Sequence, residues 1–455
     1  MWKYIAGLVV LGGAVGVAIA WVMAGDAPGP SLRFLEPTAV GRLGEMVLEI
    51  ETPGGELSSL EVTLEQREDS IAVFEMGAAL AAPLVREADD RLILRQALGR
   101  EQFESLIAGE ATLTARAVRP VLFGYREAEA TVVHEFEVRL RPPIINVQSQ
   151  FHYVNHGGSE MVVYRVSPAA ERTGVIVGDR EYTGFPAAGA GVEGADDSLY
   201  VGFFSLGWDQ DRNTPITVFA VDELGNQSTS PFDYRIFAKE FRASTITISD
   251  SFLSRVVPSI LQNSPEFRVD DPTDVLASYL AINGDMRGDN DAYITSLADE
   301  TAPEILWDGP FTQLINTAVE SGFADQREYV YDGEVVDHQT HLGFDLASTA
   351  AAPVTAANSG RIVHAGWLGI YGNCVIIDHG MGLQSLYAHL SSMDVRAGDD
   401  VEKDQQLGRT GSTGLAGGDH LHFTILLNGN AITPIDWWSE QWVEDRIIRK
   451  LREAQ

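Results

Sequence analysis

The chain has 455 residues, which is too long for one hydrophobic core and predicts about three or four domains of ~100–150 residues each. Its formal net charge of −33 argues against nucleic acid as a partner and against adhesion to anionic lipid headgroups, because both require a basic surface. The single cysteine, Cys374, excludes an intramolecular disulfide. Because Cys374 lies in the apolar run NCVIID, it is interpreted as a small buried core residue.

The N-terminal segment from Tyr4 to Ala24 carries no charge and, at about 21 residues, is long enough to cross a membrane as a helix. Lys3 precedes it and Asp26 follows it, so the positive-inside rule places the N-terminus in the cytoplasm and the rest of the chain outside. We expect an uncleaved anchor. The alternative is a signal peptide cleaved after VMA, which would release a secreted protein.

Predicted strands, in which apolar and polar residues alternate, dominate the next two regions. In SLEVTLEQ (59–66) and FEVRL (136–140), apolar and polar residues alternate with the period of a half-buried strand. The second half of 71–109 interrupts this pattern and predicts some helix. In TPITVFAVDELGN (214–226), a strand ends at Asp222 and LGN forms the turn. Both regions are interpreted as β-sandwiches.

Residues 250–321 change character. FLSRVVPSILQ, DPTDVLASYLAI and FTQLINTAVES carry apolar residues at helical spacing, which predicts a small helical segment packed against the region after it. That region is rich in short strands and glycines. The chain then ends in SEQWVEDRIIRKLREAQ, whose spacing predicts an amphipathic helix packed on or beside the Gly-rich region.

Histidines concentrate in this Gly-rich region. In HLGFD (341–345), His341 and Asp345 share a face if the run is one strand, because residues an even number apart point the same way. His420 and His422 in HLHF (420–423) share a face by the same rule, and YAHL (387–390) adds His389. Imidazole and carboxylate are standard zinc ligands. The set therefore predicts a zinc site made by His341, Asp345 and His422, with a fourth position for water and with His389 and His420 close to the metal.

Three further histidines in this part of the chain are interpreted as structural. His338, three residues before His341, faces away if the run is one strand; it is expected on the surface, with a stand-in ligand as the alternative. His379 is expected in a structural turn near the groove and His364 in a strand without a chemical role.

The ordered motifs HLGFD, YAHL and HLHF resemble the LytM/lysostaphin-type zinc endopeptidases of bacterial cell walls. The intervening PVTAANSGRIVHAG, YGNCVIIDHGMGLQSLYAHL and VRAGDDVEKDQQLGRTGSTG agree with that family. The resemblance covers roughly residues 327–436. It implies a small antiparallel β domain with zinc ligands His341, Asp345 and His422 and catalytic histidines His389 and His420. The chain departs from the family at Thr424, where Glu is common, and in ASTAAAPV, where Gly-Thr often precedes the proline.

The expected architecture is therefore multidomain and mainly β, with a C-terminal metallopeptidase domain. The predicted segments are a transmembrane anchor and linker (1–29), a β-sandwich-like region (30–143), an immunoglobulin-like domain (144–249), a helical segment (250–321), a zinc metalloendopeptidase domain (322–438) and a C-terminal helix (439–455).

The resemblance implies a Zn²⁺-dependent endopeptidase that cuts stem peptides or crosslinks of peptidoglycan. With the anchor, it predicts a single-pass inner-membrane protein whose bulk is periplasmic. Two alternatives stay open: a non-catalytic or latent regulator that activates cell-wall amidases, with 250–320 covering the groove in the latent form, and a general secreted protease.

Overall fold

The computed structural model describes residues 2–77 and 84–454. The chain divides into two compact units, Met1–Pro142 with Val221–Gln227, and Pro143–Ala220 with Ser228–Gln455. The turn at 221–227 thus belongs to the first unit, although the sequence places it within the second β region.

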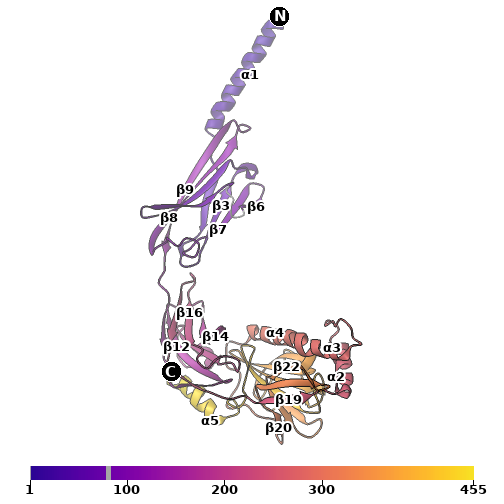
Figure 1. Ribbon diagram of the computed structural model, residues 1–455. Helices are drawn as coiled ribbons and strands as arrows, with labels where there is room; N and C mark the ends of the chain where they lie inside the picture. Colours follow the sequence, from indigo (N-terminus) through magenta and orange to yellow (C-terminus); the bar gives the residue numbers. More distant parts are fainter. Residues whose placement is uncertain (1, 78–83, 455) are drawn as a thin grey trace. The chain divides into compact units, whose positions relative to one another are not determined.

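The first unit begins with one long apolar helix, α1 (Trp2–Gly25) (Figure 1). Its stretch Leu8–Gly25 has a mean hydropathy of 2.2 and buries no residue against the rest of the chain. In length and composition α1 is therefore suited to be a membrane span or a signal sequence.

Two sheets of mainly antiparallel strands follow in the first unit, and they share one apolar core. The first has the order β1-β3-β7-β6, with β1 (Ser31–Glu36), β3 (Glu45–Glu51), β7 (Arg91–Ala97) and β6 (Leu84–Ala88). The second has the order β2-β9-β8-β4-β5, with β2 (Ala39–Val40), β9 (Arg126–Val138), β8 (Gly109–Val121), β4 (Ser59–Gln66) and β5 (Asp69–Glu75). The alternation in SLEVTLEQ is confirmed, because Leu60, Val62 and Leu64 are buried on one face of β4.

The helix expected in the second half of 71–109 is wrong for the described residues, and 78–83 lie outside them. β6 and β7 pair as a hairpin, and turns occupy 99–106. Leu92 and Leu94 are buried two residues apart, so packing on the sheet prevails over local helical spacing.

The second unit opens with a seven-stranded sheet and a two-stranded parallel ribbon. The sheet order is β10 (Ile144–Val147), β12 (Ser159–Ser167), β15 (Leu199–Ser205), β14 (Arg180–Pro186), β13 (Arg172–Val177), β16 (Ile216–Val221) and β17 (Gln227–Pro231). The ribbon pairs β11 (His152–Asn155) with β18 (Tyr234–Phe237). The turn predicted at LGN joins β16 to β17, as expected.

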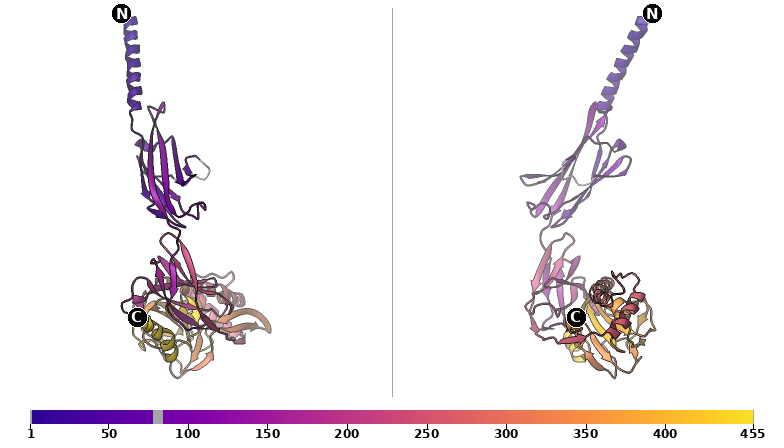
Figure 2. Two further views of the ribbon diagram at one scale, coloured as in Figure 1. Left: turned by 90° about the vertical axis from the view of Figure 1, so that its left-hand side faces the viewer. Right: turned by 45° about the vertical axis from the view of Figure 1, so that its right-hand side comes forward.

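The next segment is helical: α2 (Asp250–Asn263), α3 (Val275–Ala281), a π-helical turn (Ile282–Met286) and α4 (Arg287–Leu297). Ser249 and Asp274 cap α2 and α3, since their side chains accept hydrogen bonds from Phe252 N and Ala277 N. Both views in Figure 2 place these helices beside the C-terminal sheets. The expectation of helix in FTQLINTAVES is wrong. Its end forms β20 (Ala318–Ser321), which pairs with β23 (Phe344–Ala347), so tertiary pairing overrides the helical spacing.

Three sheets build the C-terminal β region. The main sheet has the order β20-β23-β31-β27-β26-β25-β29, with β32 beside β31; its further strands are β31 (Leu421–Leu427), β27 (Leu383–Leu390), β26 (Asn373–Gly380), β25 (Gly360–Trp367), β29 (Asp400–Val401) and β32 (Asn430–Ile432). A second sheet joins β19 (Ala243–Thr247), β21 (Asp325–Tyr331) and β22 (Glu334–His341), and a third joins β24 (Pro353–Thr355), β30 (Gln406–Arg409) and β28 (Ser392–Met393). Cys374 is fully buried in β26, which fits its interpretation as a core residue.

The chain ends in the expected helix, α5 (Glu440–Val443) and α6 (Arg449–Glu453) joined by a π-helical turn. It begins beside the C-terminal β region, where the rings of Trp437 and Trp442 lie 5.2 Å apart, but it also packs against β12 of the seven-stranded sheet, which the sequence did not predict. There the buried Lys450 Nζ donates to Glu160 Oε1 at 2.8 Å. A buried carboxylate requires such a partner, and this requirement selects the surface on which the helix packs.

Candidate functional site

HLGFD does not form one strand, as the sequence reasoning assumed. β22 ends at His341 and β23 begins at Phe344, with a break at Leu342 and Gly343 between them. The break requires glycine, because a Cβ on Gly343 would lie 2.6 Å from two ring atoms of His422. The two side chains of the motif still converge, because the break redirects the chain between them.

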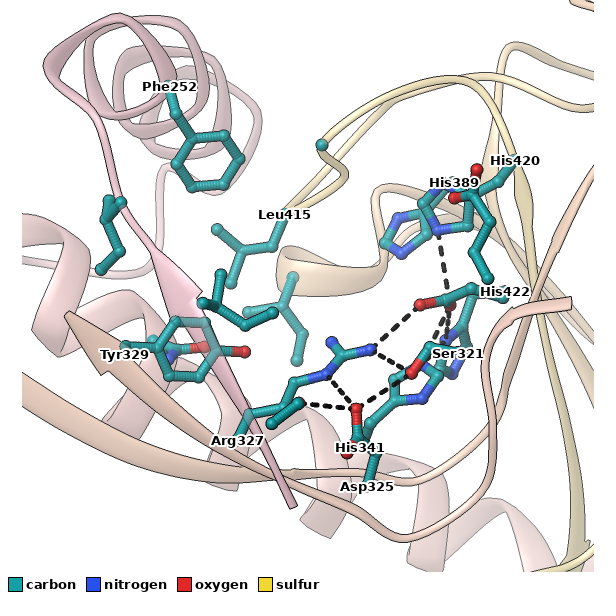
Figure 3. A pocket seen from close by; sticks show the side chains of 18 of the residues that line it. Phe252, Ser321, Asp325, Arg327, Tyr329, His341, His389, Leu415, His420 and His422 are labelled. Carbon is teal, nitrogen blue, oxygen red and sulfur yellow. Dashed lines mark hydrogen bonds and ion pairs between the residues drawn. The ribbon is translucent and has the colours of Figure 1, made fainter. Parts of the chain in front are cut away.

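The other site residues come from the main sheet and its rim. His422 lies on β31 directly opposite Asp345 on β23. His389 lies near the end of β27 with a positive φ of 63°, and His420 forms an isolated bridge with Gly411 just before β31. The four histidines are thus brought together (Figure 3) and are 6–8% exposed. Asp345 contacts three of them, His341, His420 and His422.

Three potential ligand atoms meet at one point. His341 Nε2 lies 2.9 Å from Asp345 Oδ1 and 3.0 Å from His422 Nδ1, and these last two atoms are 3.0 Å apart. Ligand atoms about 2.1 Å from a tetrahedral zinc would be separated by about 3.4 Å, so a small outward shift would admit the ion. His341, Asp345 and His422 therefore form a group that can hold a metal ion.

Hydrogen bonds on the far nitrogen of each ring set the tautomer of the two histidines. His341 Nδ1 donates to Gly322 O at 3.0 Å, and His422 Nε2 lies 3.1 Å from Thr424 Oγ1, whose own hydroxyl donates to Leu342 O. Both rings therefore direct an unprotonated nitrogen at the common point, which is the form that binds a metal.

His389 and His420 are oriented in the same manner. Their Nδ1 atoms donate to Thr413 O at 2.8 Å and to Gly418 O at 2.9 Å. His420 Nε2 then lies 3.4 Å from Asp345 Oδ1, and the ring centroids of His389 and His420 are 4.9 Å apart. In each ring Nε2 is therefore the nitrogen left to exchange a proton, and in His420 it lies beside Asp345 Oδ1.

Burial and charge set the protonation of the site. Burial raises the pKa of the Asp345 carboxyl, but the surrounding imidazoles, His341 first, overcome this and hold it well below its usual range. Burial lowers the pKa of His422 to about 4 and, with its histidine neighbours, lowers that of His389 strongly. Burial also acts to lower the pKa of His420, but its contact with Asp345 outweighs burial and raises that pKa. The carboxylate therefore stays ionised, which is the form that binds a divalent metal.

A cavity of about 490 Å³ extends from this group. The histidines line one end, and Phe252, Tyr329 and Leu415 line the other (Figure 3). Residues of β19, α2 and α3 therefore contribute to its walls. From the sequence, residues 250–320 are expected at the groove only if they cover it in a latent form. The sequence gives no reason to expect β19 at the groove.

The remaining histidines of the region lie outside the group. His338 is exposed on β22, with its side chain 69% accessible. His379 is fully buried in β26 between Ser359 O and Ser385 Oγ, and His364 is half-buried on β25 beside the Tyr293 hydroxyl.

Sequence reasoning missed Arg327, Asp325 and Ser321, which lie against the site (Figure 3). The DQR run at 325–327 holds the signal, because an acidic and a basic residue two apart share one face of a strand. Thr424, noted only as a departure, is the residue that orients His422.

Comparison with known proteins assigns this part of the chain to a family. The sequence profile of peptidase family M23 matches residues 339–434. Lipoprotein NlpD of Yersinia enterocolitica is 38% identical over 92 residues, which are 20% of this chain and 94% of that protein. The chain belongs to peptidase family M23. The resemblance drawn from HLGFD, YAHL and HLHF is thereby confirmed.

The M23 match covers only part of the longer relatives. DD-carboxypeptidase/endopeptidase Mpg of Neisseria meningitidis is 40% identical over 95 residues, 21% of this chain, and the chain spans about a fifth of its length, 22%. Among solved structures, the catalytic domain of lysostaphin from Staphylococcus simulans is 31% identical, with a TM-score of 0.23, covering 27% of this chain and 92% of that one. These matches thus cover the M23 domain and do not extend over the other regions of the chain.

Proposed function

We propose that this protein is a zinc-dependent endopeptidase that hydrolyses peptide bonds in the stem peptides or crosslinks of peptidoglycan. The observation that carries the proposal is the convergence of His341 Nε2, Asp345 Oδ1 and His422 Nδ1 within 3.0 Å, at the end of a cavity that His389 and His420 also line.

The three convergent atoms suit zinc, because two neutral imidazole nitrogens and one carboxylate oxygen form a common ligand set of catalytic zinc sites. When bound, zinc supplies Lewis-acid chemistry, polarising a carbonyl and lowering the pKa of water. His341 and His422 keep the lone pairs that hold the ion, since their other nitrogens are engaged with Gly322 O and Thr424 Oγ1.

His389 and His420 perform the proton transfers in this proposal. Their Nδ1 atoms donate to backbone carbonyls, so proton exchange takes place at Nε2. One ring accepts a proton from the attacking water at Nε2 and later gives it to the leaving amine. The second ring enters the reaction as an imidazolium protonated from solvent, keeps that proton, and donates a hydrogen bond to the carbonyl oxygen as it becomes negative. No HExxH helix is present in the sequence, so no glutamate base of that type competes for this role.

The substrate and the location rest on other observations. Peptidoglycan DD-endopeptidase ShyB of Vibrio cholerae is 31% identical over 114 residues, which supports a peptidoglycan substrate. The exposed apolar helix α1 supports anchoring in the inner membrane, with the bulk of the chain in the periplasm. No nucleic-acid partner is proposed, in keeping with the charge of −33.

A second candidate, a regulator that activates cell-wall amidases, is favoured by relatives that are named murein hydrolase activators. Murein hydrolase activator EnvC of Escherichia coli is 35% identical over 95 residues. The intact five-residue site favours the enzyme.

The test is release of soluble muropeptides from purified sacculi by residues 30–455. We expect release by the unaltered chain, and a loss of about 100-fold or more in His420→Ala, because a positioned acid–base group contributes about 10²–10⁴-fold. His338→Ala is the matched control, since it removes an exposed histidine from β22 and should leave the rate unchanged.

Removal of zinc with a chelator should abolish release, and added Zn²⁺ should restore it. Mass analysis of the products identifies the bond that is cut. A folded, zinc-loaded chain that releases nothing but increases release by an added amidase would contradict the enzyme and support the regulator.

A further inference from the structure

A line of polar contacts leads from β19 through β21 to the candidate metal group. Ser244 Oγ on β19 donates to Asp325 Oδ2 at 2.8 Å, and Arg327 Nε donates to the same oxygen at 3.5 Å. Arg327 Nη2 donates to Ser321 Oγ at 2.7 Å and to Asp345 Oδ2 at 3.2 Å. Figure 3 shows the guanidinium of Arg327 beside Ser321 and Asp325, on the side of the histidines that faces Tyr329 and Leu415.

Strand pairing places these groups. Asp325 and Arg327 lie two apart on β21 and therefore share a face. Asp325 pairs with His341 on β22, and Ser321 pairs with Asp345 on β23. The guanidinium is thus fixed by the same two pairings that bring the ends of HLGFD together.

The two oxygens of Asp345 have separate partners. Oδ1 lies 2.9–3.4 Å from nitrogens of His341, His422 and His420, while Oδ2 lies against Arg327. A carboxylate held in this way offers a single oxygen to a metal, because its other oxygen is engaged by a charged donor.

Burial makes the contact significant. The side chains of Arg327 and Asp345 are only 18% and 14% exposed, and that of Asp325 is 4% exposed. Without the guanidinium, Asp325 and Asp345 would both lose the charged donor that they share. A lysine cannot replace it fully, since a single ammonium group lacks the planar fork that bonds Ser321 and both carboxylates together.

We propose that Arg327 is a positioning residue that holds Asp345 so that only Oδ1 faces the metal. The inference rests on the proposed metal site. Asp325 and Ser321 anchor Arg327, and Ser244 extends the contact to β19, the strand that enters this region from upstream. Arg327 itself takes no part in proton transfer.

The test is zinc affinity of residues 30–455, measured by competition with a chromophoric chelator. We expect Arg327→Met to weaken zinc binding by about 10- to 100-fold, which is the usual effect of removing a group that orients a metal ligand. Arg327→Lys should recover only part of the loss. Arg242→Met is the control. Arg242 lines the same cavity, but its side chain is 68% exposed and lies 4.0 Å from Asp325 Oδ1. The zinc affinity of this variant should therefore stay within about twofold of that of the unaltered chain.

A second readout separates positioning from general destabilisation. Cobalt(II) in place of zinc reports coordination number by its visible absorption. The spectrum of Arg327→Met should shift toward higher coordination as Asp345 becomes free to bind through both oxygens. If Arg327→Met does not fold, Ser321→Ala, which removes the Nη2 anchor without changing charge, should weaken zinc binding by several-fold.

The outcomes are distinct. Failure of the unaltered chain to bind zinc would overturn the proposed function. Tight zinc binding by the unaltered chain, with the same affinity and the same cobalt spectrum in the Arg327 variants or in Ser321→Ala, would overturn the positioning role alone.

Discussion

At the scale of single residues, the site depends on which nitrogen of each ring carries the proton. For His341 the partner is a backbone carbonyl, Gly322 O, and for His422 it is a side chain, Thr424 Oγ1. The backbone partner cannot be mutated away, whereas the threonine can. Thr424 therefore offers a direct test of how the tautomer of His422 is maintained.

We expect Thr424→Val to weaken zinc binding by about 10-fold, because His422 then loses the acceptor that keeps its proton on Nε2. The lost hydrogen bonds should also lower the free energy of unfolding by about 1 kcal/mol. Chelator competition and urea unfolding measure the two effects. Thr433→Val is the matched control: Thr433 is also buried, but its hydroxyl has no hydrogen-bond partner among the described residues, so zinc binding should not change.

The convergence of the five candidate residues was predictable from the order and spacing of three motifs. Their contacts were not, because the reasoning treated HLGFD as one strand, whereas the chain breaks at Leu342 and Gly343. Arg327 was missed for another reason. Its role depends on the pairing of β20 with β23, and β20 lies in a segment whose local spacing predicts helix.

At the scale of elements, the segment between β32 and α5 contains a buried charge with an incomplete set of partners. Asp436 Oδ1 accepts from Asn155 Nδ2 at 2.8 Å, while Oδ2 has no partner in the described part of the chain. Burial raises the pKa of Asp436 to about 6, against an ordinary 3.8. The folded chain therefore holds this proton more tightly than the unfolded chain does.

Ionisation of Asp436 destabilises the folded chain. Because the folded-state pKa is the higher one, the ionised carboxylate costs stability as pH rises from about 3.8 to about 6, and the full cost applies above that range. We expect Asp436→Asn to raise the free energy of unfolding by up to about 3 kcal/mol at pH 8 and to have little effect at pH 4. Urea unfolding at the two pH values measures it.

The matched control for that substitution is Asp270→Asn, which removes the same charge from an exposed position. It should leave the unfolding free energy nearly unchanged at both pH values. A gain in Asp436→Asn that is equal at pH 4 and pH 8 would contradict the assignment of the effect to ionisation.

At the scale of the whole molecule, the candidate site belongs to one unit. All residues lining the cavity fall between Arg242 and His422, within the second unit. The first unit contains α1 and contributes none of them. Catalysis and anchoring are therefore expected to be separable.

We expect residues 143–455 to cleave a soluble crosslinked muropeptide with a kcat/KM within a few-fold of that of residues 30–455, since no group that lines the cavity is removed. A folded 143–455 chain without activity would show that the first unit contributes to the reaction.

In fractionated cells, the full chain should sediment with membranes, whereas residues 30–455 should stay soluble, because only the former contains α1.

Gly343 adds a condition for recognising, from sequence alone, a related protein in which this site is intact. A single added methyl group there would collide with the ring of His422, although every candidate ligand and both catalytic candidates would still be present in the sequence. An inventory of five polar residues is therefore not enough to separate a working peptidase from a degenerate descendant kept for another purpose. The glycine in the middle of HLGFD has to be counted as a sixth requirement, and one that can be lost without any change in charge or hydrogen-bonding capacity.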